Sequence, residues 1–285
     1  MKTKIKSILA ILIFCVMAIS YTNSSAQGTI RIRPTDENAL VSDLDLSAKI
    51  ISARLRDFSP DKFDLIVDKE KKEITVKLLG KQNQALVEEL LTQKGKLAFY
   101  ETWNRKELTE LLKGDKQLFT LLTSKNTNDT DAEMGCVAVK EMEKVKSYLE
   151  ALNLKKKCLF AWTRSFEKES NCLYALKTEL NPDGVIKGSD IDSVVYSLSK
   201  FNSMPEVLIT MKKGAVGVWG ELTKKNMERS IAIVLDGEVL SAPKVMSEIK
   251  GGRSSITGNF TRDEAKFIAA MGNNGILPLS FVIVK

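Results

Sequence analysis

The stretch Ile231–Pro243, IAIVLDGEVLSAP, joins the apolar, β-branched run Ile231–Leu235 to the strand-like residues Glu238–Leu240 through Asp236 and Gly237. An Asp-Gly pair between two such runs is the strongest short-range signal for a β-hairpin, because glycine tolerates the positive φ that a type I′ turn requires. A catalytic carboxylate would need a partner group, and the nearness of Glu238 in the sequence does not establish one. The residues therefore favour a turn over a catalytic loop.

The same stretch continues to Phe260 through a second turn-like segment, Lys250–Ser255 (KGGRSS). It lacks the G-x-x-x-x-G-K-[ST] order of a phosphate-binding loop, and strand-like residues follow it instead of a helix. Gly251 and Gly252 are therefore predicted to form a tight turn or bulge between short strands. Pro243 cannot donate a ladder hydrogen bond and marks the end or edge of a strand.

Elsewhere, apolar residues alternate with period two in some segments and recur at helical spacing in others. The predicted strands span residues 29–33, 63–67, 73–79, 96–101, 158–165, 172–179, 191–198, 207–211, 231–235 and 277–284. The predicted helices span residues 45–58, 82–92, 108–112, 117–122, 139–152, 215–226 and 261–271. Gly95 is expected to cap the second helix and Thr261 to begin the last one. The opening third reads β-α-β-β-α-β, and the mixture with several hairpins predicts an α+β fold.

The composition narrows the possible functions. The chain of 285 residues contains no histidine, which excludes serine–histidine and cysteine–histidine nucleophile pairs and most zinc and non-haem iron sites. Carboxylate-only chemistry remains open. The net charge of +7 comes partly from three lysines near the N-terminus, and the remaining basic residues form no clustered face, so nucleic-acid binding is not predicted.

The N-terminus has the pattern of a secretory signal peptide. A short basic stretch precedes the apolar run Ile8–Ile19, which is too short to span a bilayer comfortably. Small residues end at Ala26, so cleavage is predicted between Ala26 and Gln27, with residues 1–26 removed. Lipidation at Cys15 and an uncleaved anchor are the alternatives. No later stretch reaches transmembrane length, so we expect an exported protein, soluble in the periplasm or cell envelope.

Three cysteines remain after the predicted cleavage: Cys136, Cys158 and Cys172. An oxidising compartment permits a disulfide, but an odd number leaves at least one thiol free or paired with another chain. Without a C-x-x-C pair, catalytic redox use is not indicated. The sequence predicts one structural bridge or three small core residues and leaves the pairing open.

One apolar stripe allows two interpretations. Leu149, Leu152, Phe160 and Trp162 could pack in a core or line a peptide-binding groove. Such stripes belong more often to a core, and we interpret this one in that way.

The order of motifs along the sequence resembles that of a known family. The stretch from Pro205 to Val284 closely resembles the large periplasmic domain of SecD, or of fused SecDF, from the bacterial protein-export machinery. The resemblance is carried by LTKKN (222–226), IAIVLDGEVLSAP (231–243), EIKGGRSSITGNFT (248–261), DEAK (263–266) and GILP (275–278). Upstream, LAFYETW (97–103), GCVAVKEMEKVKSYL (135–149) and CLYALKT (172–178) look similar to the same domain, with RIRPT (31–35) and SARL (52–55) as weaker matches.

The resemblance implies a ferredoxin-like base with an inserted α+β head. The base would comprise residues 28–103 and a returning helix and strand over 261–285, and the head would span 104–260. In the family the head is thought to contact emerging preprotein. The family motif residues, taken as structural, are Asp236, Gly237, Ser241, Pro243, Gly251, Gly252, Gly258, Asn259 and Phe260. The family's proton-relay residues lie in membrane helices that this sequence is expected to lack, so none is carried over.

The leading hypothesis is therefore a stand-alone exported SecD-like domain, without its own proton-driven motor. Its expected partners are unfolded or nascent exported polypeptide, or components of the Sec translocon. The alternative is a structural or interaction protein of the envelope that reuses the fold for an unrelated partner. An enzyme is the third hypothesis, and no catalytic residue, metal, cofactor or nucleic-acid partner is predicted.

Overall fold

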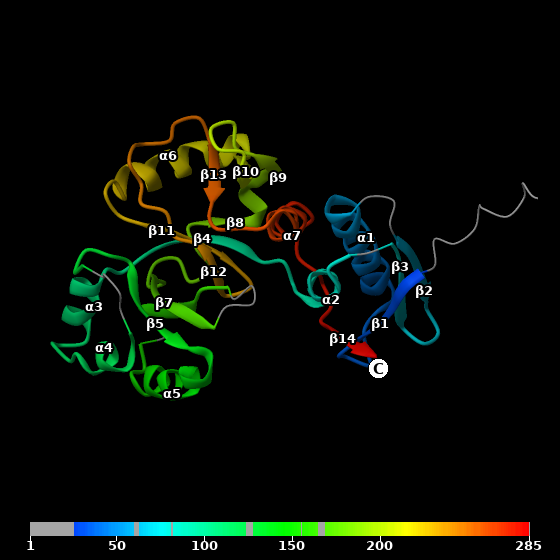
Figure 1. Cartoon of the computed structure of the whole chain (residues 1–285), viewed down its shortest axis with the longest axis horizontal. Coiled ribbons are helices and arrows are strands. Elements are labelled where there is room, and N and C mark those ends of the chain that lie inside the picture. Colours follow the sequence, from blue (N-terminus) through cyan, green and yellow to red (C-terminus); the bar gives the residue numbers. More distant parts are fainter. Residues whose placement is uncertain are drawn as a thin grey trace, which may run out of the picture.

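The first and last strands of the chain lie side by side in one sheet, which forms the base of the molecule (Figure 1). The computed structural model describes residues 26–59, 63–80, 82–123, 128–154, 156–164 and 169–284. The base sheet has the order β14-β1-β3-β2, with all neighbours antiparallel. Its elements are β1 (Ala26–Pro34), α1 (Val41–Phe58), β2 (Phe63–Asp68), β3 (Glu73–Leu79), α2 (Gln84–Thr92) and β14 (Phe281–Val284). This is the β-α-β-β-α-β arrangement of a ferredoxin-like unit.

The base is held together by one face of its sheet packed against its helices. Ile30 and Ile32 on β1 and Ile74 on β3 are buried, as are Leu44 and Ile51 on α1. This burial follows the period-two alternation of the strands and the helical spacing of α1. The ferredoxin-like base predicted from the sequence is therefore confirmed in fold.

The fourth strand of the base comes from the end of the chain. The predicted strand at 96–101 exists as β4 (Leu97–Glu101), but it pairs with β11 and β8 and not with the base. The opening third thus has the predicted element order β-α-β-β-α-β, but its last strand, β4, belongs to a sheet of the head. Strand pairing favours a base–head boundary near residue 95, in place of the proposed division at residue 103.

The head contains three further sheets within the described residues. One has the order β12-β11-β4-β8, the second β13-β10-β9 and the third β5-β7-β6. Their strands are β5 (Glu133–Ala138), β6 (Cys158–Trp162), β7 (Ser170–Lys177), β8 (Ile186–Lys187), β9 (Ile191–Leu198), β10 (Pro205–Met211), β11 (Ile231–Leu235), β12 (Glu238–Ser241) and β13 (Arg253–Thr257). The helices are α3 (Arg105–Leu111), α4 (Gln117–Leu121), α5 (Met142–Ala151), α6 (Val216–Lys225) and α7 (Arg262–Asn273), with short 3-10 turns at Val139–Glu141, Gly188–Asp190 and Lys213–Ala215.

Helix α7 joins the base to the head. It packs against α1 and α2 of the base and against β9 and β10 of the head (Figure 1). It begins at a capping box in which the Thr261 hydroxyl accepts from the Glu264 N–H and the Glu264 carboxylate accepts from the Thr261 N–H, as the threonine and acidic first turn predicted.

Three local predictions differ from the structure. Helix α2 is capped by Gln93, and Gly95 lies two residues further on with φ +83°. The last strand begins at Phe281, four residues after the predicted start. Strand β7 spans Ser170–Lys177, two residues earlier than predicted. Gly251 and Gly252 lie in a turn just before β13, as predicted.

Two predictions concern the chain termini and membrane contact. The predicted signal peptide falls on residues 1–25, outside the described residues, together with Ala26, the first residue of β1. Among the described residues, no helix is long and apolar enough to cross a membrane.

Candidate functional site

Asp236 and Gly237 form the turn between β11 and β12, with φ angles of +50° and +88°. The positive φ of both residues is the type I′ requirement that the Asp-Gly pair predicted. The Asp236 carboxylate has a second contact that the sequence did not reveal. It accepts hydrogen bonds from the backbone N–H groups of Gly95 (2.8 Å) and Lys96 (2.7 Å), while its own N–H donates to the Lys96 carbonyl (3.0 Å). Asp236 therefore fastens the head hairpin to the connection between α2 and β4.

A buried arginine, Arg54 of α1, lies next to this connection. Its guanidinium donates to four backbone carbonyls, those of Leu90, Gln93, Lys94 and Gly275, at 2.6–3.2 Å. These carbonyls belong to the segments where the chain leaves α2 and α7. Burial lowers the pKa of Arg54 to about 10, partly opposed by the charge of Asp236. Arg54 thus ties together the two connections between base and head.

Arg164 makes a comparable link from the head side. It is 4% exposed, pairs with Glu238 of β12 (2.9 Å) and Glu89 of α2, and stacks over the Phe267 ring at 4.7 Å. Neither arginine was predicted from the sequence as a functional or structural residue. For Arg54 a signal was present, because it falls on the apolar stripe of α1 between Ile51 and Leu55. A charged residue at a core position of an amphipathic helix indicates a buried, paired cation.

The residues after the Asp236 turn form one wall of an apolar pocket in the head. The pocket has a volume of 360 Å³ and is lined by residues of β4, α6, β11, β13 and the segment between β12 and β13. Phe99 and Trp219 meet edge to face in it, with ring centroids 5.3 Å apart. The lining residues include Thr223, Ile231, Ile233, Pro243, Val245, Ile249 and Ser254.

The rim of this pocket, hereafter the head pocket, combines one flexible apolar residue with two cations. Met246 is 69% exposed at the rim, and Lys244 and Arg253 also line it. The buried indole N–H of Trp219 has no hydrogen-bond partner in the part of the chain that the structure describes. A pocket of this size and lining can receive an apolar side chain, and methionine adapts to differing shapes.

The motif residues expected from the sequence have different surroundings, and one of them lies in the lining of this pocket. Pro243 lines it, and Gly252 has φ +64° with the position of a Cβ only 2.7 Å from Val216 Cγ2, so a larger residue would not fit. The Gly258 Cβ position would clash with the buried Phe260 ring at 2.8 Å. The Ser241 hydroxyl donates to the Thr257 carbonyl at 3.5 Å, while Gly251 and Asn259 are exposed.

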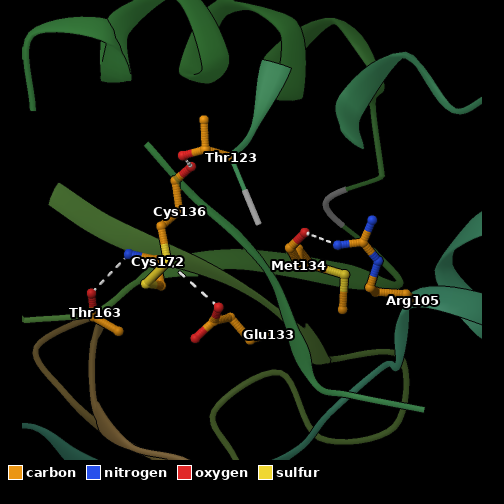
Figure 2. The surroundings of a disulfide bond; sticks show 7 residues. All are labelled: Arg105, Thr123, Glu133, Met134, Cys136, Thr163 and Cys172. Carbon is orange, nitrogen blue, oxygen red and sulfur yellow. Dashed lines mark hydrogen bonds between the residues drawn. A yellow bond between two sulfur atoms is a disulfide. The ribbon is translucent and has the colours of Figure 1, made fainter. Parts of the chain in front are cut away.

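A second hollow lies beside the disulfide Cys136–Cys172, which joins β5 to β7 (Figure 2). The hollow has a volume of 770 Å³ and a largely polar lining that includes Cys136, Glu133 and Tyr174. Burial, with the nearby charge of Asp131, raises the pKa of Glu133. Glu133 lies 3.5 Å from Cys136 Sγ, but both sulfur atoms are used by the disulfide, so the group offers no thiolate to a metal ion.

The third cysteine, Cys158 of β6, is a buried thiol. Burial raises its pKa to about 12, so the thiolate needed for nucleophilic chemistry is scarcely populated at neutral pH. The arrangement of one bridge and one buried thiol is among the alternatives that the sequence left open.

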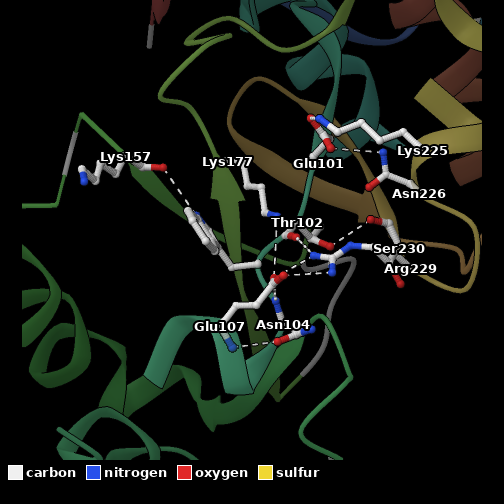
Figure 3. Close-up of polar contacts among 11 residues, drawn as sticks. Glu101, Thr102, Asn104, Glu107, Lys157, Lys177, Lys225, Asn226, Arg229 and Ser230 are labelled. Carbon is white, nitrogen blue, oxygen red and sulfur yellow. Dashed lines mark hydrogen bonds and ion pairs between the residues drawn. The ribbon is translucent and has the colours of Figure 1, made fainter. Parts of the chain in front are cut away.

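A network of charged side chains links α3 to the segment that follows α6. Glu107 of α3 accepts from Asn104 and pairs with Arg229 at 2.7 Å, and Lys177 lies 3.6 Å from it (Figure 3). Burial is the largest single influence on Glu107 and works against its ionised form, but the hydrogen bonds from Arg229 and Asn104 and the charge of Lys177 together lower the pKa of Glu107. Lys177 also lies over the Trp103 ring at 4.6 Å. Every charge named here has a partner, so the network serves to hold the head together.

Comparison with known proteins identifies the head. Residues 165–279 match the family model described as "SecDF, P1 head subdomain". Among curated relatives, protein translocase subunit SecD of Magnetococcus marinus is 35% identical over 103 residues, which cover 35% of this chain and 19% of that protein. SecD of Sebaldella termitidis is 33% identical over 114 residues, covering 39% of this chain and 28% of that protein. SecD of Rhodothermus marinus is 42% identical over 81 residues, covering 28% and 13%.

Solved structures show the same fold over most of the chain. A crystal structure of SecDF in a super-membrane-facing form matches 90% of this chain and 29% of its own, with a TM-score of 0.55 and 20% identity. A structure described as a membrane component SecDF that enhances protein export matches 90% of this chain and 98% of its own, with a TM-score of 0.52 and 19% identity. In contrast, the chain spans less than a third of the length of the curated relatives named above.

Proposed function

From the match of residues 165–279 to the SecDF P1 head subdomain, we infer that this chain is a polypeptide-binding module of protein export. We propose that it contacts unfolded or translocating polypeptide outside the cytoplasm, either directly or while associated with the Sec translocon. The observation that carries the proposal is the head pocket, because it lies within the head and is lined largely by residues of the matched segment.

The chemistry of the head pocket suits such a ligand. Unfolded chains differ from folded proteins in exposing large apolar side chains, and the pocket presents an apolar interior that includes Phe99, Trp219 and Ile233. The cation Arg253 at the rim adds attraction for acidic residues that flank such side chains, whereas Lys244 is already paired with Glu228 at 2.6 Å. Met246 at the mouth allows one pocket to accept side chains of several shapes.

Site-specific photo-crosslinking in the cell envelope tests the proposal. A photoreactive amino acid is placed at Met246, and a matched control at Ile66, which is 51% exposed on β2 of the base. We expect adducts with nascent exported chains or Sec components from position 246 and markedly fewer from position 66. A correctly localised protein that gives neither kind of adduct from position 246 would overturn the proposal. Adducts with an unrelated envelope partner would favour an interaction protein that has reused the head.

A further inference from the structure

A groove between α5 and β6 lies outside the residues that match the SecDF head model. It has a volume of 190 Å³, with Leu149 and Leu154 on one side and Phe160 and Trp162 on the other. These side chains are half-buried and pack partly against the small core beneath them. Our interpretation of this stripe as core is thus incomplete, because the same residues also line a surface groove.

The side of β6 that faces the groove is a free strand edge. β6 is the last strand in the order β5-β7-β6, and its pairing partner is β7. Phe160 lies opposite Ala175, whose carbonyl accepts from Trp103, so Phe160 and Ala175 do not form a hydrogen-bonded pair. The Thr163 N–H donates to the Cys172 carbonyl, so by antiparallel alternation the backbone groups of Phe160 and Trp162 point away from β7.

The free edge is short because both of its ends are occupied. At one end the Cys158 N–H donates to the Leu154 carbonyl at 2.9 Å. At the other end the Arg164 N–H donates to the Val239 carbonyl at 2.9 Å, which begins a parallel bridge to β12. The same bridge brings the Val239 N–H to the Trp162 carbonyl, so the backbone groups left open in the described part of β6 are the N–H and C=O of Phe160 and the N–H of Trp162.

The chemistry of the site selects its occupant. Outward N–H and C=O groups repeated along a strand are matched by one kind of partner, an extended main chain that adds as a further strand. The charged residues in the lining are Lys146 and Glu150, of opposite sign, so the groove offers no net charge to a nucleic acid or an anionic surface. Its floor is apolar, so it suits the alternate side chains of a strand that carries valine, isoleucine or leucine.

We propose that the α5–β6 groove binds a short extended polypeptide segment by strand addition to β6. The N–H and C=O of Phe160 and the N–H of Trp162 supply the hydrogen bonds, and alternate apolar side chains of the segment enter between Leu149 and Trp162. This site goes beyond the proposed function, since it is separate in sequence from the head pocket and either site can fail alone.

The test uses the full chain and three synthetic peptides. The first is a capped heptapeptide of alternating valine and threonine with a lysine at each end. The other two are N-methylated on the valines or on the threonines, which removes every second main-chain donor and leaves the side chains unchanged. Binding is followed by NMR through the amide signals of Phe160 and Trp162 and their hydrogen exchange.

If the peptide adds to β6 as a strand, only every second main-chain N–H of the peptide faces β6. One methylated peptide should therefore bind as the parent does, and the other should bind at least about tenfold more weakly. The parent should slow amide exchange at Phe160 and Trp162. Equal weakening by the two methylations, binding without any change at these two amides, or no binding of the parent would each overturn the proposal. Changes confined to residues 244–247 would place the peptide in the head pocket and equally contradict the groove.

A pair of variants checks the groove wall. Leu149→Lys places a charge in the apolar floor and should weaken the parent peptide at least about tenfold. Val195→Lys, at a residue 51% exposed on β9 of the head, should leave the affinity within about twofold. If Leu149→Lys lowers the stability of the fold, the methylated peptides still decide the question on the unaltered chain.

Discussion

Asp236 shows how one residue can satisfy a local and a long-range requirement together. Its positive φ belongs to the hairpin turn, and its carboxylate belongs to the connection that leads from the base into the head. A carboxylate that accepts two backbone N–H groups forms stronger hydrogen bonds than a neutral acceptor. The residue that first suggested catalysis is therefore used for architecture.

Substitutions at Asp236 should separate these two contributions. Asp236→Asn keeps one acceptor and tolerates a positive φ, so it should cost about 1 kcal/mol of unfolding free energy. Asp236→Ala loses both acceptors and adds backbone strain, so it should cost about 2–4 kcal/mol. Urea-induced unfolding of both variants measures the difference.

Asp183 provides the matched control, because it also lies in a turn and its contact is an exposed ion pair with Lys96 at 2.7 Å. Asp183→Ala should cost less than about 1 kcal/mol. Equal losses for Asp183→Ala and Asp236→Ala would contradict the role assigned to the Asp236 carboxylate.

At the scale of the elements, the sequence was informative about type and much less so about partners. The hairpins β2–β3, β6–β7 and β11–β12 were predicted correctly, because the turn and the alternation lie within one short segment. The partner of β4 was not, because β11 lies about 130 residues further along the chain and the alternation of β4 fits either sheet equally well.

The same limit applies to the sites. The Asp236–Gly237 turn could be predicted from two adjacent residues, whereas the four carbonyls around Arg54 come from two segments of the chain that are far apart in the sequence. The head pocket could not be predicted either, since Phe99 and Trp219 meet only once β4 and α6 have packed together. The resemblance to SecD was visible in the sequence because it depends on the order of motifs and needs no spatial contact.

The disulfide is the element-scale feature with the largest expected effect on stability. Cys136 and Cys172 are separated by 36 residues, and the segment between them carries α5 and β6 (Figure 2). A bridge that closes a loop of this length is worth about 4 kcal/mol in the chain-entropy model. Replacing both cysteines by serine should therefore lower the unfolding free energy by a few kcal/mol.

Thermal unfolding with and without a dithiol reductant measures this contribution. The reductant should lower the Tm of the natural chain toward that of the double variant and leave the double variant unchanged. Cys158→Ala serves as the control, because it removes a small buried thiol and should retain the sensitivity to reductant. If the reductant cleaves the bridge but leaves the Tm of the natural chain unchanged, the disulfide does not contribute the stability assigned to it.

At the scale of the whole molecule, the base is assembled from the two ends of the chain and the head is inserted between them (Figure 1). Two connections, after α2 and after α7, join the parts, and Arg54 binds carbonyls in both. The core is continuous across this junction, since α7 packs on both sides. This arrangement makes the stability of the base depend on residues that follow the head in the sequence.

Deleting the final five residues, 281–285, tests this dependence. The deletion removes β14, turns β1 into an edge strand of the base sheet and exposes the part of the core in which Phe281 is buried. Hydrogen exchange should become at least about tenfold faster at amides of β1 and α1, because these elements lose a strand and its packing. Amides of β10 and β11 in the head should change by less than about threefold, because their sheets remain complete.

Ile283→Ala, at a residue 40% exposed on β14, is the control and should have a small effect on both groups of amides. If β10 and β11 lose protection in parallel with β1, base and head unfold as one unit and the inserted head has no independent stability.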